Sequence, residues 1–260
     1  MSQIFIPQVG AVMSADIAVP DHSREQQFYS RVLTTGETPL WREDLMSNIG
    51  VPIIGLGART AEHENLPLQW MPHIQVADVA ASVQRATELD GEVLMHQKDK
   101  DGNSQWAVLR DPNGAAFGVV PVIPAETIPA VDDGDAPVGH IAWLDLTITN
   151  AASTAEFYKQ VVGWSVQDLA MKHEAIDYAD YLMQGPNGKA IAGVCHARGV
   201  NLELPPVWLL YLPVGDMQES LRLVPELGGT VLRSIKGKDG AYVYAAIQDP
   251  VVAVFAIAPA

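Results

Sequence analysis

The chain is an internal duplication, and this repeat constrains its fold more than any other feature. The matching residues that lie 129 positions apart are Asp16 with Asp145 and the Phe-Tyr pair at 28–29 with that at 157–158. Those that lie 138 positions apart are Trp70 with Trp208 and the Asp-Pro pair at 111–112 with that at 249–250. The second copy therefore holds an insertion of nine residues between Tyr158 and Trp208. We expect this insertion in a surface loop between strands, where length changes are tolerated.

The repeat divides the chain into two domains and a linker. Residues 122–137 are rich in Pro, Asp and Gly and show no apolar periodicity, which is typical of an exposed linker. We therefore predict domains over residues 8–121 and 138–259, joined by the linker at 122–137.

Each copy consists of two similar halves. A strand-like stretch leads into an Asp or Asn at four places, and a helical pattern follows each one; these residues are Asp21, Asp78, Asn150 and Asp216. Asp and Asn are favoured N-caps because the side-chain oxygen accepts an unpaired backbone N–H. Two or three strand-like segments follow each helix. Each quarter of the chain therefore reads as strand, helix and further strands, which predicts an α+β fold.

Composition narrows the classes of partner. Of the 260 residues, 48% are hydrophobic and 18% charged, which suits a packed core. The formal net charge of −15 repels phosphate backbones and anionic membranes, so we predict neither nucleic-acid nor membrane partners. The single cysteine excludes an internal disulfide, and no apolar run reaches the length of a membrane span. We expect a cytoplasmic monomer or homodimer with a small-molecule ligand.

These features together resemble the glyoxalase/bleomycin-resistance/extradiol-dioxygenase family, also called the vicinal oxygen chelate family. The resemblance rests on the helices with Phe-Tyr, on Gly163-Trp164 after one of them, and on the endings DPNGAAFGVV and DPVVAVFAIA. Trp143-x-Asp145-Leu146 with Trp208-x-x-Tyr211 is similar to a tandem subgroup labelled hydroxylase or glyoxalase-like. The resemblance implies tandem paired βαβββ modules that form two curved mixed β-sheet cups, with helices packed outside.

Metal-using members of that family hold a divalent ion in the cup, with His and Glu ligands on the first and last strands of each module. The corresponding positions here are Ser14, Met71, Gly118, Trp143, Leu209 and Ala256. Serine is a poor ligand and the other five side chains have no suitable donor, whereas a transition-metal site needs three or four N, O or S donors. We therefore predict no metal at the family position and no other cofactor.

Strand alternation selects other residues for the cups, because side chains two positions apart share a face of the sheet. It predicts that Asp16 faces His73 in the first cup and that Asp145 faces Tyr211 in the second. The further predicted lining residues are Gln75, Trp106, Trp143, Thr147 and Tyr244. Asp16, His73 and Asp145 are also candidates for acid–base catalysis. Alternatively, these groups only satisfy hydrogen bonds across the sheet, and Trp106 and Tyr244 pack beneath the helices.

The remaining candidates have weaker support. His140 and His196 lie near strand ends and, with Asp145, form an alternative metal site. Cys195, on an apolar strand, is predicted to be a core residue rather than a nucleophile. His63 lies in a polar, loop-like stretch, so we expect it to be solvated.

Three functions fit this pattern. The first is a metal-independent protein that binds a small, partly apolar molecule. The second is an enzyme of the family, a lyase, isomerase or oxygenase that uses a metal or an Asp/His pair. The third is a scaffold whose cups no longer bind anything. The missing metal ligands favour the first.

Overall fold

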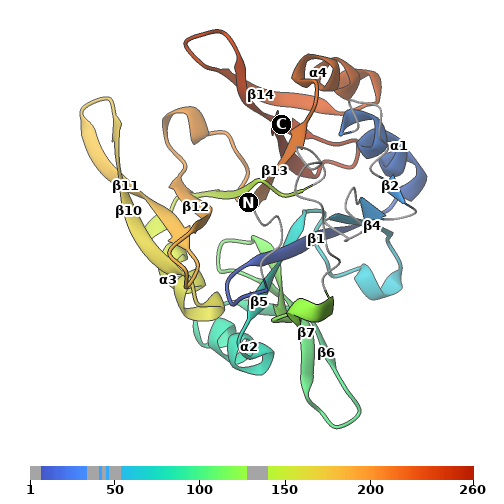
Figure 1. Ribbon diagram of the computed structural model, residues 1–260, viewed down its shortest axis with the longest axis vertical. Helices are drawn as coiled ribbons and strands as arrows, with labels where there is room; N and C mark the ends of the chain where they lie inside the picture. Colours follow the sequence, from blue (N-terminus) through green and yellow to red (C-terminus); the bar gives the residue numbers. More distant parts are fainter. Residues whose placement is uncertain (1–6, 34–40, 43–44, 47–53, 128–139) are drawn as a thin grey trace.

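The computed structural model describes residues 7–33, 41–42, 45–46, 54–127 and 140–260 (Figure 1). The first half contains β1 (Val12–Val19), α1 (His22–Val32), β2 (Trp41–Arg42), β3 (Leu45–Met46), β4 (Ile54–Ala58), η1 (Ala61–His63), β5 (Met71–Val76), α2 (Val79–Glu88), β6 (Glu92–Lys98), β7 (Ser104–Arg110), β8 (Ala116–Pro121) and η2 (Ala125–Thr127). The second half contains β9 (Trp143–Ile148), α3 (Ala151–Val162), β10 (Ser165–His173), β11 (Ile176–Gln184), β12 (Ala190–His196), η3 (Gly199–Asn201), β13 (Trp208–Val214), α4 (Met217–Glu226), β14 (Thr230–Lys236), β15 (Tyr242–Gln248) and β16 (Val254–Pro259).

The strands form two mixed eight-stranded sheets of the same topology. Their orders are β2-β3-β4-β1-β5-β8-β7-β6 and β10-β11-β12-β9-β13-β16-β15-β14. In each sheet two βαβββ modules meet at a central antiparallel pair, β1 with β5 or β9 with β13. The predicted α+β fold of tandem paired modules is therefore confirmed. None of the helices in the described residues is long and apolar enough to cross a bilayer.

Three of the four predicted N-caps act through their side chains. The carboxylates of Asp21, Asp78 and Asp216 accept backbone N–H groups of the first helical turn. Asn150 precedes α3 as predicted, but its side chain makes no capping bond. Instead its backbone carbonyl accepts the hydroxyl of Thr154. The helix starts were therefore located correctly, although one is stabilised differently.

The strand pairing locates the nine-residue insertion more closely than the sequence does. Asp16 lies opposite Gly55, and Asp145 lies opposite Gly193. The two glycines are already 138 residues apart, so the extra residues precede Gly193. This part of the second copy contains the long β10–β11 hairpin, whose strands pair over nine positions. The insertion is thus associated with that hairpin.

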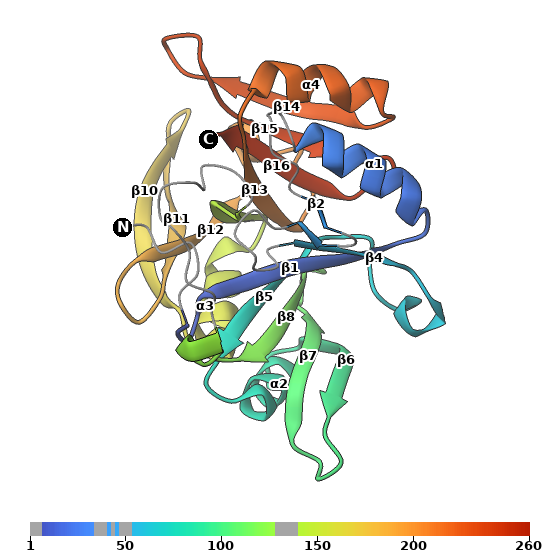
Figure 2. The ribbon, with the colours of Figure 1, turned by 45° about the vertical axis from the view of Figure 1, so that its right-hand side comes forward.

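The helices pack between the two sheets, and each contacts a helix of the other domain. Helix α1 lies beside α4, and α2 lies beside α3 (Figure 2). A single cluster of buried apolar side chains includes residues from both domains. Two glycines allow this close contact: a Cβ on Gly229 would lie 2.7 Å from the ring of Phe28, and one on Gly91 would lie 3.2 Å from that of Phe157. The two domains therefore share one core.

Two buried hydrogen-bond chains cross this shared core. The Tyr29 hydroxyl donates to Asp249 Oδ2 at 2.6 Å and accepts from Trp70 Nε1 at 3.0 Å. In the other half, the Tyr158 hydroxyl donates to Asp111 Oδ2 at 3.2 Å and accepts from Trp208 Nε1 at 2.9 Å. We call these two chains the aromatic locks. Each lock joins a tyrosine of one domain to the Asp-Pro turn of the other.

The aspartates of the locks also hold their own turns. Asp111 Oδ1 accepts the backbone N–H groups of Asn113 and Ala115. Asp249 Oδ1 accepts those of Val251 and Ala253. The repeated Asp-Pro pairs therefore stabilise the turns before the last strands and, through Oδ2, the contact between domains.

The first part of the predicted linker is attached to the first sheet. The backbone N–H of Ile123 donates to Gln75 Oε1 at 3.0 Å, and η2 follows it. Residues 128–137 of the linker lie outside the described residues. The boundary of the first domain at residue 121 coincides with the end of β8.

We predict that Tyr158→Phe destabilises the protein by about 1–3 kcal/mol, because Asp111 Oδ2 and Trp208 Nε1 each lose a buried partner. Chemical denaturation monitored by circular dichroism measures the change. The matched control is Tyr242→Phe, since Tyr242 is partly exposed and its ring contacts the Lys236 ammonium. An equal effect of the two substitutions would show that the lock adds no stability.

The core also contains a pH-sensitive group, Glu25, which is fully buried beside Asp249. Burial, and then repulsion by Asp249, raises its pKa from 4.5 to about 8. The folded protein therefore holds this proton more tightly than the unfolded chain does. Stability from this group is complete below pH 4.5 and falls as the pH rises towards 8.

We accordingly predict that Glu25→Gln makes unfolding less dependent on pH between 5 and 8, and that it stabilises the protein by on the order of 2 kcal/mol at the upper end. Urea denaturation at a series of pH values tests this. Glu64→Gln, on an exposed residue, is the control. A Glu25→Gln variant that keeps the wild-type pH slope would contradict the shifted pKa.

Candidate functional site

The first cup is built on a row of residues that lie opposite one another across the first sheet. From β1 to β6 the row is Ser14, His73, Gly118, Val108 and Met95. Directly opposite residues point to the same face of a sheet. This face is the one that carries the cavity described next.

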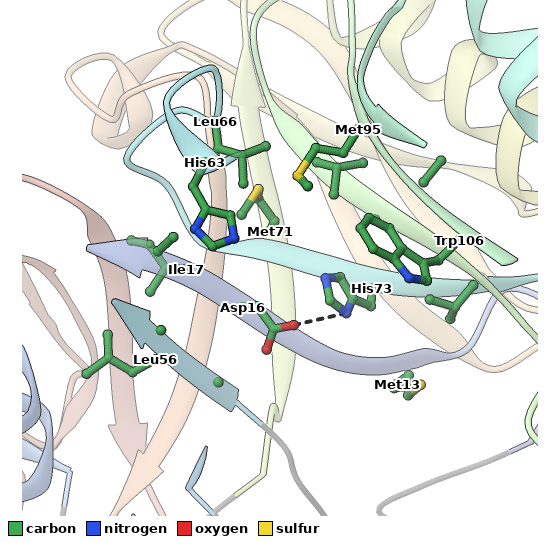
Figure 3. Close-up of a pocket in the computed structure, with 17 residues that line it drawn as sticks. Met13, Asp16, Ile17, Leu56, His63, Leu66, Met71, His73, Met95 and Trp106 are labelled. Carbon is green, nitrogen blue, oxygen red and sulfur yellow. Dashed lines mark ion pairs between the residues drawn. The ribbon is translucent and has the colours of Figure 1, made fainter. Parts of the chain in front are cut away.

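A cavity of about 510 Å³ opens on this face (Figure 3). Its walls are mostly apolar and include the flexible side chains of Met13, Met71 and Met95. The ring of Trp106, which is 36% exposed, also lines it. Asp16 and His73 supply polar groups at the wall (Figure 3). The volume lies within the range of pockets that take small organic molecules.

Asp16 and His73 form a pair across the central strands. The Asp16 carboxylate lies 3.4 Å from His73 Nδ1, and the Ser14 hydroxyl lies 3.2 Å from the same nitrogen. A Cβ on Gly118 would lie only 2.4 Å from the His73 ring. The imidazole therefore covers Gly118, and any larger residue there would displace it. His73 and Asp16 can accept or donate a proton, or hydrogen-bond a polar group in the cavity.

One prediction for the first cup, that for Gln75, needs correction. His63, expected to be solvated, is partly exposed and lines the cavity, and its Nδ1 accepts the backbone N–H of Thr60. Gln75 was expected to line the cup, but it is fully buried and its amide bonds the backbone at Ala11 and Ile123. The segments before β1 and after β8 thus cover Gln75. The alternation of side chains along β5 alone cannot predict such a cover.

The second cup has the equivalent row, with different side chains. From β9 to β14 it consists of Trp143, Tyr211, Ala256, Ala246 and Arg233. Asp145 accepts the indole N–H of Trp143 at 2.7 Å and a hydrogen bond from Tyr211. Tyr211 in turn contacts Tyr244 edge to face, with ring centroids 5.4 Å apart. Asp145 and Tyr211 therefore bond to each other, as the alternative interpretation allowed.

The environment of Asp145 is poor in water. Burial raises its pKa to about 6, although the Trp143 and Tyr211 hydrogen bonds oppose the shift. Thr147 is buried and lies opposite Cys195. A Cβ on Gly193 would lie 2.3 Å from Asp145 Oδ1 and 3.5 Å from Cys195 Sγ, so the thiol and the carboxylate share a face. Cys195 is thus partly exposed on the cup side rather than in the core.

The Cys195 thiol is unsuited to act as a nucleophile. Burial, and then the charges of Asp145 and Asp180, raise its pKa well above the ordinary value. Asp180 is a buried carboxylate that the sequence did not single out. It accepts the backbone N–H of His196 at 2.7 Å and lies 3.2 Å from His196 Nδ1. Asp180 lies on β11 in no recognisable sequence motif, so the sequence alone could not identify it.

The side chains present do not fit a divalent metal. Among the described residues, no three His, Cys, Asp or Glu side chains converge as ligands would. In the first cup Asp16, His63 and His73 line one cavity but do not converge, and Gly118, where the resemblance implies a carboxylate, has no side-chain donor. In the second, His196 is turned to Asp180, and no such group includes it with His140 and Asp145. The alternative metal site predicted from His140 and His196 is therefore not formed.

We predict that Asp145→Asn stabilises the protein by about 1 kcal/mol at neutral pH, because it removes the cost of a buried charge and keeps an acceptor for Trp143. The raised pKa fixes the sign: wild-type stability falls as the pH rises from 3.8 towards 6. Denaturation at pH 5 and pH 7 compares the two proteins. Asp239→Asn, on an exposed turn, is the control. A loss of stability at neutral pH would contradict this account.

Comparison with known proteins agrees with this architecture. Residues 13–120 match the model of the family described as glyoxalase-like domain. The anthracycline biosynthesis protein DnrV of Streptomyces peucetius is 27% identical over 172 residues, which are 65% of this chain and 58% of that protein. A putative glyoxylase of Mycobacterium tuberculosis, CFP32, is 29% identical over 91 residues, 35% of this chain and 34% of its own.

Solved structures share the fold over nearly the whole chain. The Mn(II)-bound glyoxalase from Novosphingobium aromaticivorans superposes with a TM-score of 0.58 at 15% identity and covers 97% of this chain and 82% of its own. The trihydroxybiphenyl dioxygenase of Sphingomonas wittichii gives a TM-score of 0.54 at 13% identity, with coverages of 97% and 90%. Residues 13–120 therefore match a glyoxalase-like domain, and nearly the whole chain shares the fold of these glyoxalase and dioxygenase structures.

Proposed function

We propose that the first cup binds a small, largely apolar molecule and that Asp16 and His73 hold a polar group of that ligand. The observation that supports this most is the cavity of about 510 Å³, whose apolar walls contain one Asp–His pair. A concave apolar site with few convergent polar groups is the usual form of a small-molecule site. The proposal includes binding without a metal, since Asp16, His63 and His73 line the cavity but, among the described residues, are not grouped closely enough to share an ion.

The chemistry of the walls suggests what the ligand looks like. Three methionines adapt their shape to different apolar surfaces, and the Trp106 ring offers a flat face for stacking. A planar, polycyclic or aromatic body with a hydroxyl or carbonyl group would use all of these features. The name of DnrV connects that protein with anthracycline biosynthesis. Because this chain aligns with only 58% of DnrV, the name serves here to choose the first probe.

The first experiment is a titration with an anthracycline and a panel of simpler planar phenols and quinones. Tryptophan fluorescence reports binding because Trp106 lines the cavity, and Trp106→Phe identifies its share of the signal. We expect Asp16→Asn and His73→Gln each to weaken binding about tenfold, the cost of about one lost charge-assisted hydrogen bond. Asp101→Asn, on an exposed turn, should leave affinity unchanged.

Two outcomes would count against the proposal. One is the absence of saturable binding across the whole panel by a folded protein. The other is binding that Trp106→Phe, Asp16→Asn and His73→Gln leave unaltered, which would place the ligand elsewhere. Elemental analysis of the purified protein for transition metals accompanies the titration. A near-stoichiometric metal that is lost in Asp16→Asn would contradict metal-independent binding.

A second candidate function is acid–base catalysis in the same cup. The specific observation in its favour is the Asp16–His73 contact, since a carboxylate beside an imidazole orients the ring for proton transfer. Mass spectrometry of each bound probe after long incubation distinguishes the two functions. A product that forms with the wild type and not with His73→Gln would support an enzyme, whereas unchanged probes would support binding alone.

A further inference from the structure

The floors of the two cups are built from equivalent residues. The first floor contains Leu66, Met71, Val108 and Ala116, and the second contains Leu204, Leu209, Ala246 and Val254. Each residue of the second set lies 138 positions after its counterpart in the first. Both cups thus retain an apolar floor at equivalent positions.

The largest difference is Arg233, which occupies the position of Met95. Both residues lie at the outer end of the cup row, opposite Ala246 or Val108. Because Met95 lines the first cavity and opposite residues share a face, the Arg233 side chain rises from the cup face of the second sheet. An apolar wall in one cup is therefore replaced by a cation in the other.

The guanidinium of Arg233 has unused hydrogen-bonding capacity. Its side chain is only 18% exposed, and Nη1 is buried with no hydrogen-bond partner. In the described part of the chain its ion pair is a 3.8 Å contact from Nη2 to Glu203, whose side chain is 87% exposed. An exposed, loosely placed carboxylate compensates a buried cation poorly. A buried donor of this kind is costly unless something else occupies it.

The neighbours of Arg233 are aromatic and apolar. Burial raises the pKa of Tyr244, the Arg233 charge opposes the shift, and the Asp145 charge adds to it, so both charged groups act on the Tyr244 hydroxyl. Tyr244 contacts Tyr211, and Tyr211 packs against the apolar cluster that contains Leu209 of the floor and Ala256. The Asp145 carboxylate is in the same cup, on β9, where it accepts a hydrogen bond from Tyr211, and Asp180 lies on β11, further from β14 in the sheet.

We propose that the second cup is a separate binding site for a small organic anion, whose carboxylate pairs with Arg233 while its apolar body lies on Tyr244 and the floor. Guanidinium and carboxylate match in shape and form paired charge-assisted hydrogen bonds, which would occupy the free Nη1. The proposal does not depend on the ligand of the first cup. It assigns the two cups different ligands, an uncharged apolar molecule for the first and an anion for the second.

The test is a calorimetric titration of the whole protein with benzoate, with benzamide as the uncharged molecule of the same shape. The main variant is Arg233→Met, which restores the residue that the equivalent position already accommodates. We expect saturable benzoate binding and at least about a tenfold loss of benzoate affinity in Arg233→Met. Benzamide lacks the charge, so its binding in the first cup should be the same in the wild type and in Arg233→Met. Met95→Leu is the matched control in the first cup and should keep the wild-type affinity for benzoate.

A thermal melt separates binding from a structural role. If Arg233 serves a ligand, Arg233→Met should melt at or above the wild-type temperature, and benzoate should raise only the wild-type melting temperature. A variant that unfolds would be replaced by Arg233→Lys, which keeps the charge, loses the planar fork and should bind benzoate more weakly. Benzoate binding that survives Arg233→Met, or no binding of benzoate, hexanoate or phosphate by the folded wild type, would overturn the proposal. Trp106→Phe and Asp16→Asn, which test the first cup, should leave benzoate binding intact.

Discussion

The hydrogen bond from a buried tyrosine to the Asp-Pro turn of the opposite domain is the constraint on which the rest of the structure depends. Tyr29 and Tyr158 make it reciprocally, to Asp249 and Asp111. In each lock a polar chain is satisfied only if both domains are in place, because its members come from both. The phenylalanines beside the two tyrosines pack in the same reciprocal way, into spaces left by Gly229 and Gly91. Neither domain has a complete core alone, so the sheets keep a fixed relation and their cups face away from the shared core.

This arrangement leaves the cups free to differ. The faces towards the helices carry the locks and the common core, where a change of residue disturbs both domains. The cup faces keep only an apolar floor in common, and the groups above it have changed from His73 to Tyr211 and from Met95 to Arg233. The asymmetry extends to the core at one point. Glu25 stands where the second copy has Thr154, and there a buried acid replaces the hydroxyl that bonds Asn113.

The repeat and the strand alternation predicted the modules and the face on which Asp16, His73 and Trp106 lie, because both depend on local periodicity and on spacing along the chain. They did not predict the reciprocal packing, since a duplicated sequence is equally compatible with helices that contact only their own sheet. Gln75 was misplaced because the segments that cover it, around Ala11 and Ile123, are distant from it in sequence. Arg233 was missed for a related reason. The sequence around Arg233 has the polar pattern of an exposed strand. Its proposed role follows only from its equivalence to Met95 and from its unpaired Nη1, which the structure shows.

The charge of Arg233 has to be considered together with the acidity of the whole protein. With a net charge of −15, the surface repels anions at a distance and offers a cation many alternative partners. A guanidinium that stays largely buried under these conditions, with one poorly placed carboxylate nearby, gains little from the surrounding protein. Long-range repulsion is screened within about 10 Å at ordinary salt, whereas a desolvated guanidinium acts at contact distance, where it is strongest. The acidic surface would therefore slow the approach of an anion without preventing its capture, and selectivity would reside in the short-range geometry of Arg233, Tyr244 and the floor beneath them.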